Sequence, residues 1–334
     1  MEGEREYLHK WRKLCNRVEP YSYRFFSHFM GNSSLIVPED VARQYIERTL
    51  NPIRYRNFYS DKNLYEYYID SKYLPISYLR RIRGGYFNKS YDCVDADKAI
   101  GMIPGTCNRL ILKPSIDSCS GQGVMLFVRK DNDWESSNSM VKLSKSFLDY
   151  YGEDFVLQEA LSQSDYMTQF CSTAVNTLRI ATYTSPIDET VHVLGSVMRI
   201  GRIGCFIDNA HAGGMIVGVD KLSGKVGERL FATEGTSMDT WNGVCFKNND
   251  FVIPNWDEIM DFACYVASRN KHCRFLALDV GLDKDNHPKL IEYNVDGFSY
   301  WMFMLVGQSV FGELTDEVID YCATHKNIRE QMSL

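Results

Sequence analysis

The sequence predicts an α+β protein, because its pattern changes along the 334 residues. Residues 1–80 carry apolar side chains at helical spacing, for example in PEDVARQYIERTL (38–50). From about residue 110, short β-type runs follow one another, including RLILKP, GVMLFV, NTLRIATYT and VHVLGSVMRI. PNWDEIMDFACYVASRN (254–270) predicts a further amphipathic helix, with Asn255 and Glu258 at the spacing of a capping box. Helices combined with hairpin strands are typical of α+β folds.

Composition and charge narrow the class of protein. The chain is 45% hydrophobic and 24% charged, which suits one large or two to three smaller globular domains. Its net charge of −6 gives no support to nucleic-acid binding, which usually requires a basic face. No apolar run approaches the roughly 18 residues of a transmembrane segment, and the charged start MEGEREYLHKWRK lacks a signal-peptide core. The 10 cysteines include no C-x-x-C pair, so we expect buried free thiols, for example Cys205, Cys264 and Cys273, and a cytoplasmic protein.

Two alternating runs near the C-terminus predict an antiparallel hairpin. RFLALDVGL and KLIEYNVDG flank DKDNHP, which is rich in turn-forming residues. If Leu282 pairs with Lys289, Asp279 lies opposite Glu292, and Asn294 falls on the same face. Facing carboxylates are destabilising unless a cation lies between them, and these oxygen donors suit Mg²⁺ or Mn²⁺ bound together with substrate phosphates. The alternative is a solvated polar face, which a shift of register by one residue would favour.

A loop in the middle of the chain has the composition of a phosphate-binding segment. The run LILKP carries Lys113 near its end and leads into a stretch of small residues that includes Ser118, Ser120, Gly121 and Gly123. Small residues let backbone N–H groups approach phosphate oxygens, while the lysine supplies positive charge. The alternative is an ordinary hairpin turn.

Polar residues in three later runs extend this interpretation. FVLQEAL carries Gln158 and Glu159, with Asp165 shortly after, and such residues match the hydrogen-bonding groups of adenine and ribose. Arg179 and Arg199 lie within β-type runs, so each needs an anionic partner, which is either a carboxylate or a phosphate.

The order of these motifs resembles the ATP-grasp superfamily, and most of all the ATP-grasp proteins associated with sugar transfer in bacterial surface-polysaccharide gene clusters. VNTLRIATYT, DNAHAGGMIVGVD, IPNWDEIM and KLIEYNVDG carry the closer match, which runs from about residue 58 to residue 299. The resemblance implies an ATP-grasp fold, in which two α+β subdomains clasp ATP. We expect a mostly helical, substrate-side region over 1–108, a small ATP-grasp subdomain over 109–164, and a large subdomain with the metal site over 165–334.

The resemblance also implies roles for individual residues. The expected phosphate contacts are Lys62, Lys113, Ser118, Ser120, Gly121 and Gly123. The remaining nucleotide contacts are Gln158, Glu159 and Leu161 at adenine, Asp165 at the ribose, and Asn209. Asp279, Glu292 and Asn294 would hold Mg²⁺, with two ions expected and Mn²⁺ as a substitute. Arg179, Arg199 and His211 would act on the γ-phosphoryl group, although a lone histidine such as His211 also fits a structural role.

The implied reaction joins a carboxylate to an amine through an acyl phosphate, at the expense of ATP. The expected substrates are a uronic acid and an amino acid or amine in capsule or O-antigen biosynthesis. We expect the protein in the cytoplasm, either free or at the inner face of the membrane. A phosphotransferase acting on a sugar hydroxyl is the main alternative, and a nucleotide-binding scaffold is a third. Arg80, Arg81 and Arg83 fit either an anionic glycan site or a solvated basic face. The tyrosines around them fit either sugar stacking or an ordinary core, and the oligomeric state stays open.

Overall fold

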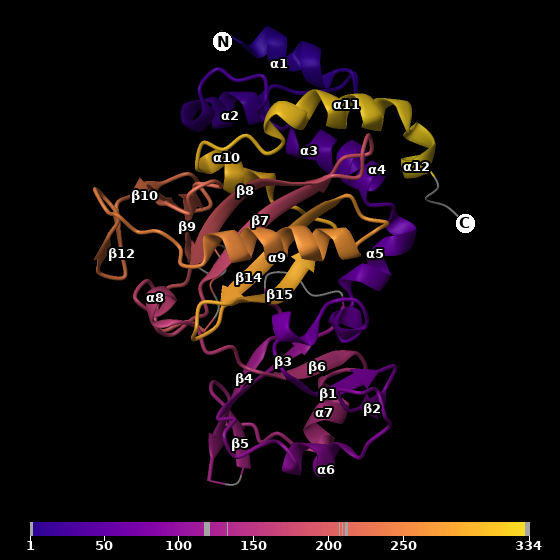
Figure 1. Cartoon of the computed structure of the whole chain (residues 1–334), viewed down its shortest axis with the longest axis vertical. Helices are drawn as coiled ribbons and strands as arrows, with labels where there is room; N and C mark the ends of the chain where they lie inside the picture. The colour runs from indigo at the N-terminus through magenta and orange to yellow at the C-terminus, as the bar shows by residue number, and fades with distance from the viewer. Residues whose placement is uncertain are drawn as a thin grey trace. The chain divides into compact units, whose positions relative to one another are not determined.

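The computed structural model describes residues 3–116, 121–131, 133–206, 208, 210 and 213–330, and the chain divides into two compact units. Unit 1 comprises Met1–Asn57 and Gln163–Leu334, and unit 2 comprises Phe58–Ser162. Each unit combines helices with an antiparallel sheet (Figure 1). The predicted α+β class is therefore confirmed.

Unit 2 is built on a six-stranded sheet with the order β2-β1-β6-β3-β4-β5. Its strands are β1 (Ser77–Ile82), β2 (Gly85–Phe87), β3 (Arg109–Pro114), β4 (Met125–Lys130), β5 (Asp133–Ser136) and β6 (Phe155–Glu159). Its helices are η2 (Lys62–Tyr67), η3 (Ser71–Tyr73), α6 (Ala96–Gly101) and α7 (Lys145–Tyr151). Leu79, Leu112 and Leu157 pack with Ala96 and Leu148 in one apolar core. The expected boundary at residue 108 falls inside this unit, because β1 pairs with β6, a strand much later in the sequence.

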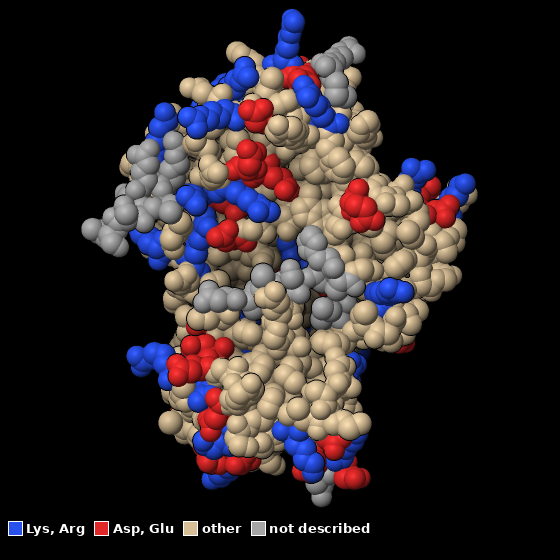
Figure 2. Space-filling model, turned by 180° about the vertical axis from the view of Figure 1, so that it is seen from behind, with Lys and Arg blue, Asp and Glu red and all other residues tan. Residues whose placement is uncertain are grey.

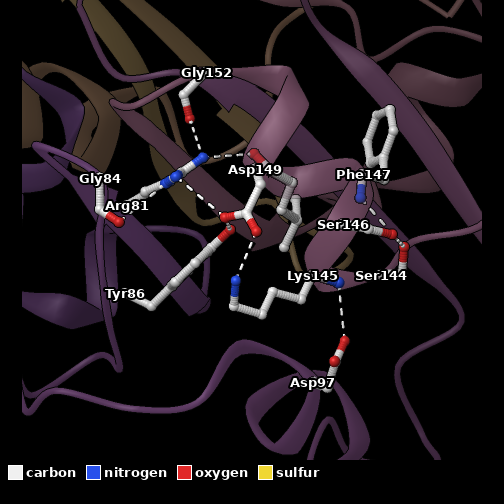
Figure 3. Close-up of polar contacts among 11 residues, drawn as sticks. Arg81, Gly84, Tyr86, Asp97, Ser144, Lys145, Ser146, Phe147, Asp149 and Gly152 are labelled. Atoms are coloured by element: carbon white, nitrogen blue, oxygen red, sulfur yellow. Dashed lines mark hydrogen bonds and ion pairs between the residues drawn. The ribbon is translucent and has the colours of Figure 1, made fainter.

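Arg81 connects strand β1 to the end of helix α7 (Figure 3). Its guanidinium donates to the carbonyl oxygens of Leu148 at 2.8 Å, Gly152 at 2.9 Å and Gly84 at 3.2 Å. The last carbonyls of a helix have no partner within the helix, so a buried arginine satisfies them well. Its Nη2 also pairs with the carboxylate of Asp149 at 3.1 Å.

The basic run around Arg81 is mostly removed from solvent. Arg80 is fully buried and pairs with Glu66 at 2.6 Å, and Arg81 is 9% exposed. Only Arg83 of the three is exposed. The alternative of a solvated basic face is therefore wrong for Arg80 and Arg81, because their side chains hold the unit together.

Unit 1 is built on a seven-stranded sheet with the order β11-β10-β9-β8-β7-β14-β15. Its strands are β7 (Thr177–Thr184), β8 (Val191–Ile200), β9 (Met215–Val219), β10 (Val226–Phe231), β11 (Ser237–Met238), β14 (Phe275–Leu282) and β15 (Pro288–Asn294). A small ribbon pairs β12 (Thr240–Trp241) with β13 (Val244–Cys245).

Unit 1 also contains helices from before and after unit 2 in the sequence. The N-terminal ones are α1 (Glu4–Trp11), α2 (Tyr21–Met30), α3 (Glu39–Val41), the π-helical η1 (Ala42–Glu47), α4 (Arg48–Leu50) and α5 (Ile53–Ser60). The later ones are α8 (Asp165–Thr168), α9 (Trp256–Arg269), α10 (Tyr300–Leu305), η5 (Gly312–Leu314), α11 (Thr315–Thr324) and α12 (Lys326–Glu330). Helix α9 packs across β7, β8, β14 and β15 (Figure 1).

One face of the central strands carries apolar side chains at one end and polar side chains at the other. Ala181, Tyr183, Phe275 and Ala277 share a core with apolar residues of α1, α2, α10 and α11. Opposite residues in a sheet share a face, and every second residue of a strand does too. The same face therefore continues into Arg179 and Asp279, where polar side chains replace apolar ones.

The helix predicted over 254–270 is confirmed as α9, but its predicted capping box is absent. Asn255 precedes α9 in a left-handed conformation and makes no capping bond, because its amide donates to the carbonyls of Asp285 and Asn286. Helix α5 ends at Ser60, and Asp61 caps η2 by accepting from the backbone N–H of Asn63. The helical run predicted over 38–50 is confirmed by α3, η1 and α4.

The surface and the thiols agree in part with the sequence expectations. Figure 2 shows Lys and Arg side chains interspersed with Asp and Glu on the visible face. The described cysteines are free; Cys273 is buried, whereas Cys205 and Cys264 are only partly buried. Within the described ranges, the helices are too short or too polar to cross a membrane.

Candidate active site

The hairpin of β14 and β15 has the predicted register at its polar end. Asp279 lies opposite Glu292, and Ala277 lies opposite Asn294. Beyond Asp279 a bulge at Ile291 shifts the pairing, so that Leu282 lies opposite Pro288 and not Lys289. The bulge takes up the extra residue, which leaves the two carboxylates and the amide on one face.

A row of charges crosses three neighbouring strands at this end of the sheet. Arg179 on β7 lies opposite Asp279 on β14, which lies opposite Glu292 on β15. Arg179 donates to both carboxylate oxygens of Asp279, from Nε at 2.5 Å and from Nη2 at 3.0 Å. Arg179 is 6% exposed and Asp279 is 2% exposed, so this bidentate pair is removed from water.

A second arginine extends the row to β8. Arg199 lies opposite Thr177, and its Nη1 donates to Asp279 at 3.0 Å. Its Nη2 donates to Asp208 at 2.5 Å, and Asp208 also accepts from the hydroxyl of Thr177. Asp208 was not predicted, although it stands in DNAHAGG beside the predicted Asn209. The partners that the sequence left open for Arg179 and Arg199 are carboxylates.

The opposite charges favour the ionised forms of Asp279 and Arg199. Burial alone raises the pKa of Asp279, but the positive charges of Arg179 and Arg199 outweigh burial and lower it below its usual range. Burial alone lowers the pKa of Arg199, but Asp208 and Asp279 reverse this, and the net shift is upward. Nε of Arg199 is buried and has no hydrogen-bond partner among the described residues. Among the residues that the structure describes, this buried N–H donor of the cluster therefore lacks an acceptor.

The donor atoms of the predicted metal ligands are of the type that a hard divalent cation prefers. Asp279, Glu292 and Asn294 offer carboxylate and amide oxygens from adjoining register positions on one face. Asp279 accepts from two arginines, so a cation there would share this carboxylate with them. Within the described ranges, no group of three or more His, Cys, Asp and Glu side chains is placed to hold a metal. The predicted set includes only two such residues and an amide, which is typical of Mg²⁺ that also takes substrate oxygens.

Unit 2 places its predicted phosphate-binding lysines close in the fold. Lys62 opens η2, and its backbone N–H donates to the carbonyl of Ser115, two residues after Lys113. Lys62 is 7% exposed and Lys113 is 8% exposed. Gly123 follows in a left-handed conformation, and a Cβ there would lie 2.9 Å from Pro114 Cγ, so this turn requires glycine. Gly121 is left-handed as well.

The predicted adenine edge lies on the central strand of unit 2. Gln158 pairs with Ile111 on one side and Ser77 on the other. Glu159 lies opposite Leu110, and Leu161 follows in a loop. Asp165 belongs to unit 1, where it is the exposed first residue of α8.

Residues before 60 hold the loop that follows Asn294, which the sequence did not indicate. Glu47, which is 1% exposed, accepts from the backbone N–H groups of Gly297 at 2.9 Å and Phe298 at 3.3 Å. Asn51 donates to the carbonyl of Val295 at 2.9 Å. Burial raises the pKa of Glu47, and the two backbone bonds oppose that shift. These long-range contacts leave no pattern in the local sequence.

Four predicted site residues, Ser118, Ser120, Asn209 and His211, lie outside the described residues. Their roles stay predictions, as do the ligand-binding roles of the others.

Comparison with known proteins places the chain in a family. A family model described as sugar-transfer associated ATP-grasp matches residues 40–318, which is most of the chain. This chain therefore belongs to the sugar-transfer-associated ATP-grasp family, and the predicted resemblance is confirmed. No curated protein matches it.

Several solved structures are similar to this chain at a distance. D-cycloserine synthetase DcsG has a TM-score of 0.42 and 10% identity, over 84% of this chain and 73% of that chain. D-alanyl-alanine synthetase A from Vibrio cholerae O1 biovar eltor has a TM-score of 0.42 and 11% identity, over 88% and 67%. D-alanine–D-alanine ligase from Bacillus anthracis has a TM-score of 0.42 and 11% identity, over 82% and 70%. These likenesses are too distant to bear on function.

Proposed function

We propose that this protein is an ATP-dependent carboxylate–amine ligase. The γ-phosphoryl group of ATP would pass to a carboxylate oxygen, which forms an acyl phosphate and releases ADP. An amine would then attack the acyl carbon, lose a proton and displace phosphate, which leaves an amide. The proposed substrates are a uronic acid and an amino acid or amine of a surface polysaccharide, in line with the sugar-transfer association of the family.

The charged row on β8, β7, β14 and β15 carries this proposal. Nε–H of Arg199 is buried near Asp279 and has no acceptor in the described part of the chain, and a phosphoryl oxygen is an anion that would accept from it. Arg179 is fixed by its bidentate contact with Asp279, so both guanidinium groups are oriented before any ligand binds. Asp279, Glu292 and Asn294 would hold Mg²⁺, which when bound neutralises phosphate oxygens.

Unit 2 carries its own residues proposed to contact the nucleotide. Lys62 and Lys113 would contact the phosphates together with the loop that contains Gly121 and Gly123. Gln158 would accept from the amino group of adenine. The family assignment supports these roles, because the matched region includes every one of these residues.

Hydroxylamine trapping tests the reaction class. The full chain is incubated with Mg²⁺, ATP, a panel of uronic acids and their glycosides, and hydroxylamine, while ADP and hydroxamate are measured. We expect hydroxamate with one carboxylate class, and a loss of at least about 100-fold in Glu292→Gln, because the variant keeps the shape but removes a charged oxygen ligand. Glu228→Gln, an exposed carboxylate on β10, is the matched control and should keep full turnover.

The other outcomes separate the alternatives. ADP release with a stable phosphorylated sugar and no hydroxamate would replace the ligase by a phosphotransferase. Failure of Mg²⁺ and ATP to bind at all would remove the nucleotide site and the proposed function with it.

A further inference from the structure

The end of β15 that carries Asn294 is held by a residue from the N-terminal helical segment. Asn51 is 1% exposed, and its side-chain amide bonds to the backbone of unit 1. Its Oδ1 accepts from the N–H of Phe275 at 3.0 Å, and its Nδ2 donates to the carbonyls of Phe275 at 2.5 Å and Val295 at 2.9 Å. One side chain therefore joins the first residue of β14 to the residue that follows β15.

Asn51 extends the hydrogen-bonded ladder between these two strands. Ala277 lies opposite Asn294 at the end of the pairing, so two further residues along the same register would bring Phe275 opposite Asp296. The amide of Asn51 takes the place of that pair, because it exchanges an N–H and a C=O with Phe275 as a residue of a neighbouring strand does. The pair of Ala277 and Asn294 is thereby supported beyond the end of the ladder.

The orientation of the Asn294 amide depends on the strand beside it. Its Nδ2 donates to the carbonyl of Ala277 at 3.3 Å. A carbonyl oxygen only accepts, so the nitrogen of the amide must make this contact, and Oδ1 is left as the acceptor. A hard divalent cation binds oxygen. The position of the Ala277 carbonyl therefore decides where the amide presents its oxygen, and Asn51 fixes the backbone next to both partners.

Glu47 holds the same loop about one turn earlier in the N-terminal segment. It is the last residue of the π-helical η1, and its buried carboxylate accepts from the N–H groups of Gly297 and Phe298. Burial of a carboxylate costs free energy, and both π-helical turns and buried carboxylates occur often at functional sites. We propose that Asn51 and Glu47 are positioning residues, which hold the end of β15 so that Asn294 presents its oxygen to Mg²⁺.

This inference rests on the proposed function, because it takes a divalent cation to bind at Asn294. Metal binding is therefore measured apart from turnover. The probe is Mn²⁺ together with adenylyl imidodiphosphate, a non-hydrolysable ATP analogue, on the full chain, and electron paramagnetic resonance reports the free Mn²⁺. The affinity for the analogue in EDTA and the melting temperature are measured on the same preparations.

Asn51→Ala should weaken Mn²⁺ binding by about tenfold, which is the usual effect of removing an outer-shell partner of a metal ligand. Glu47→Gln should weaken it by less, since its amide oxygen still accepts one of the two hydrogen bonds. In Asn294→Ala, the addition of Asn51→Ala should cause no further loss, as expected for residues that act through one ligand. The affinity for the analogue in EDTA should stay the same in every variant.

Asn270→Ala is the matched control, since Asn270 is also a buried asparagine of unit 1, is 2% exposed and donates to the carbonyl of Val266 at 2.8 Å. It should lower the melting temperature, as Asn51→Ala does, but keep the wild-type affinity for Mn²⁺. Should Asn51→Ala fail to fold, Glu47→Gln decides the question by the same comparison.

The remaining outcomes separate this inference from the proposed function. Equal Mn²⁺ affinities in Asn51→Ala and Asn270→Ala would overturn the inference while leaving the proposed function intact. A further loss of Mn²⁺ affinity when Asn51→Ala is added to Asn294→Ala would overturn it as well, because Asn51 would then not act through Asn294. A wild type that binds neither Mn²⁺ nor the analogue would instead overturn the proposed function, and this inference with it.

Discussion

Arg81 in unit 2 and Arg199 in unit 1 are both largely removed from solvent, but their guanidinium groups contact different partners. Arg81 donates to three backbone carbonyls at the end of α7 and in the turn after β1, and it pairs with one surface carboxylate. Arg199 pairs with the carboxylates of Asp208 and Asp279, and its Nε has no hydrogen-bond partner within the described ranges. Backbone carbonyls occupy fixed places in a fold and only need a donor there, whereas we infer that the cluster of side-chain charges on one sheet face is arranged to bind a ligand.

An unpaired nitrogen alone does not distinguish a structural arginine from one in a ligand-binding site. Nε of Arg80 is also buried without a hydrogen-bond partner, yet its guanidinium lies 4.9 Å from the ring centre of Tyr91 and pairs with Glu66. The difference at Arg199 is the setting, in which Arg179, Arg199 and Asp279 lie on neighbouring strands beside Glu292 and Asp208 joins them from a loop. The comparison therefore predicts that unit 1 gives up stability for its charge cluster, while Arg81 contributes stability to unit 2.

The largest effect is expected from Asp279→Asn. The variant leaves Arg179 and Arg199 buried with too little negative charge, which should lower the free energy of unfolding of unit 1 by about 3–5 kcal/mol. Turnover should also disappear, because the variant loses a proposed metal ligand. Urea denaturation and ADP release measure the two effects. Asp316→Asn is the control, because this carboxylate is 61% exposed beside Lys10 and should cost less than about 1 kcal/mol. Equal losses in both variants would contradict the special role of the buried cluster.

Substitution of each arginine by methionine should produce opposite results. Arg81→Met should lower the stability of unit 2 by about 2–3 kcal/mol, because it leaves carbonyls at the end of α7 without a donor. Turnover per folded molecule should stay unchanged. Arg199→Met should instead reduce turnover by about 100-fold or more, with a smaller loss of stability, since Asp279 keeps Arg179 and Asp208 keeps Thr177.

Hydrogen exchange and ADP release on the same preparations separate the two effects. In Arg81→Met, faster exchange should be confined to amides of β1 and α7. A loss of turnover without faster exchange in this variant would show that Arg81 belongs to the site, and the contrast between the two arginines would fail.

The sequence predicted which residues of this site share a strand face better than it predicted which side chains contact one another. Alternation in RFLALDVGL and KLIEYNVDG fixed the facing of Asp279 and Glu292, because strand periodicity is local. The bulge at Ile291 left no signal, and neither did the pairing of Arg199 with Asp208, which depends on the folding of a loop. The capping box at Asn255 failed for a similar reason: Glu258 contacts His287 instead, at 2.9 Å. Contacts between distant segments compete with local motifs, and local patterns do not show which contact prevails.

The smallest expected effect concerns the pKa values of Asp149, which Arg81 contacts, and of Asp279, which Arg199 contacts. Hydrogen bonds from Lys145 and Tyr86 lower the pKa of Asp149, with a further contribution from the positive charge of Arg81 (Figure 3). Arg179 and Arg199 lower that of Asp279 against the effect of burial. Each lowered pKa contributes stability above the unfolded value, near pH 4, and this stability is lost as the pH falls through the folded value.

Salt should separate these two carboxylates. Asp149 pairs with Lys145 at the surface, where the screening length falls from about 10 Å at 0.1 M salt to about 3 Å at 1 M. Its pKa should therefore rise toward the ordinary value in 1 M NaCl, while that of Asp279 stays low because its partners are buried with it. Carbon-13 NMR titration of the carboxyl groups measures both, and Lys145→Met should raise the pKa of Asp149 in low salt and reduce its response to added salt. Equal salt shifts at Asp149 and Asp279 would mean that water reaches both clusters, and the row of charges in unit 1 would then not be the dry, oriented site that phosphoryl transfer requires.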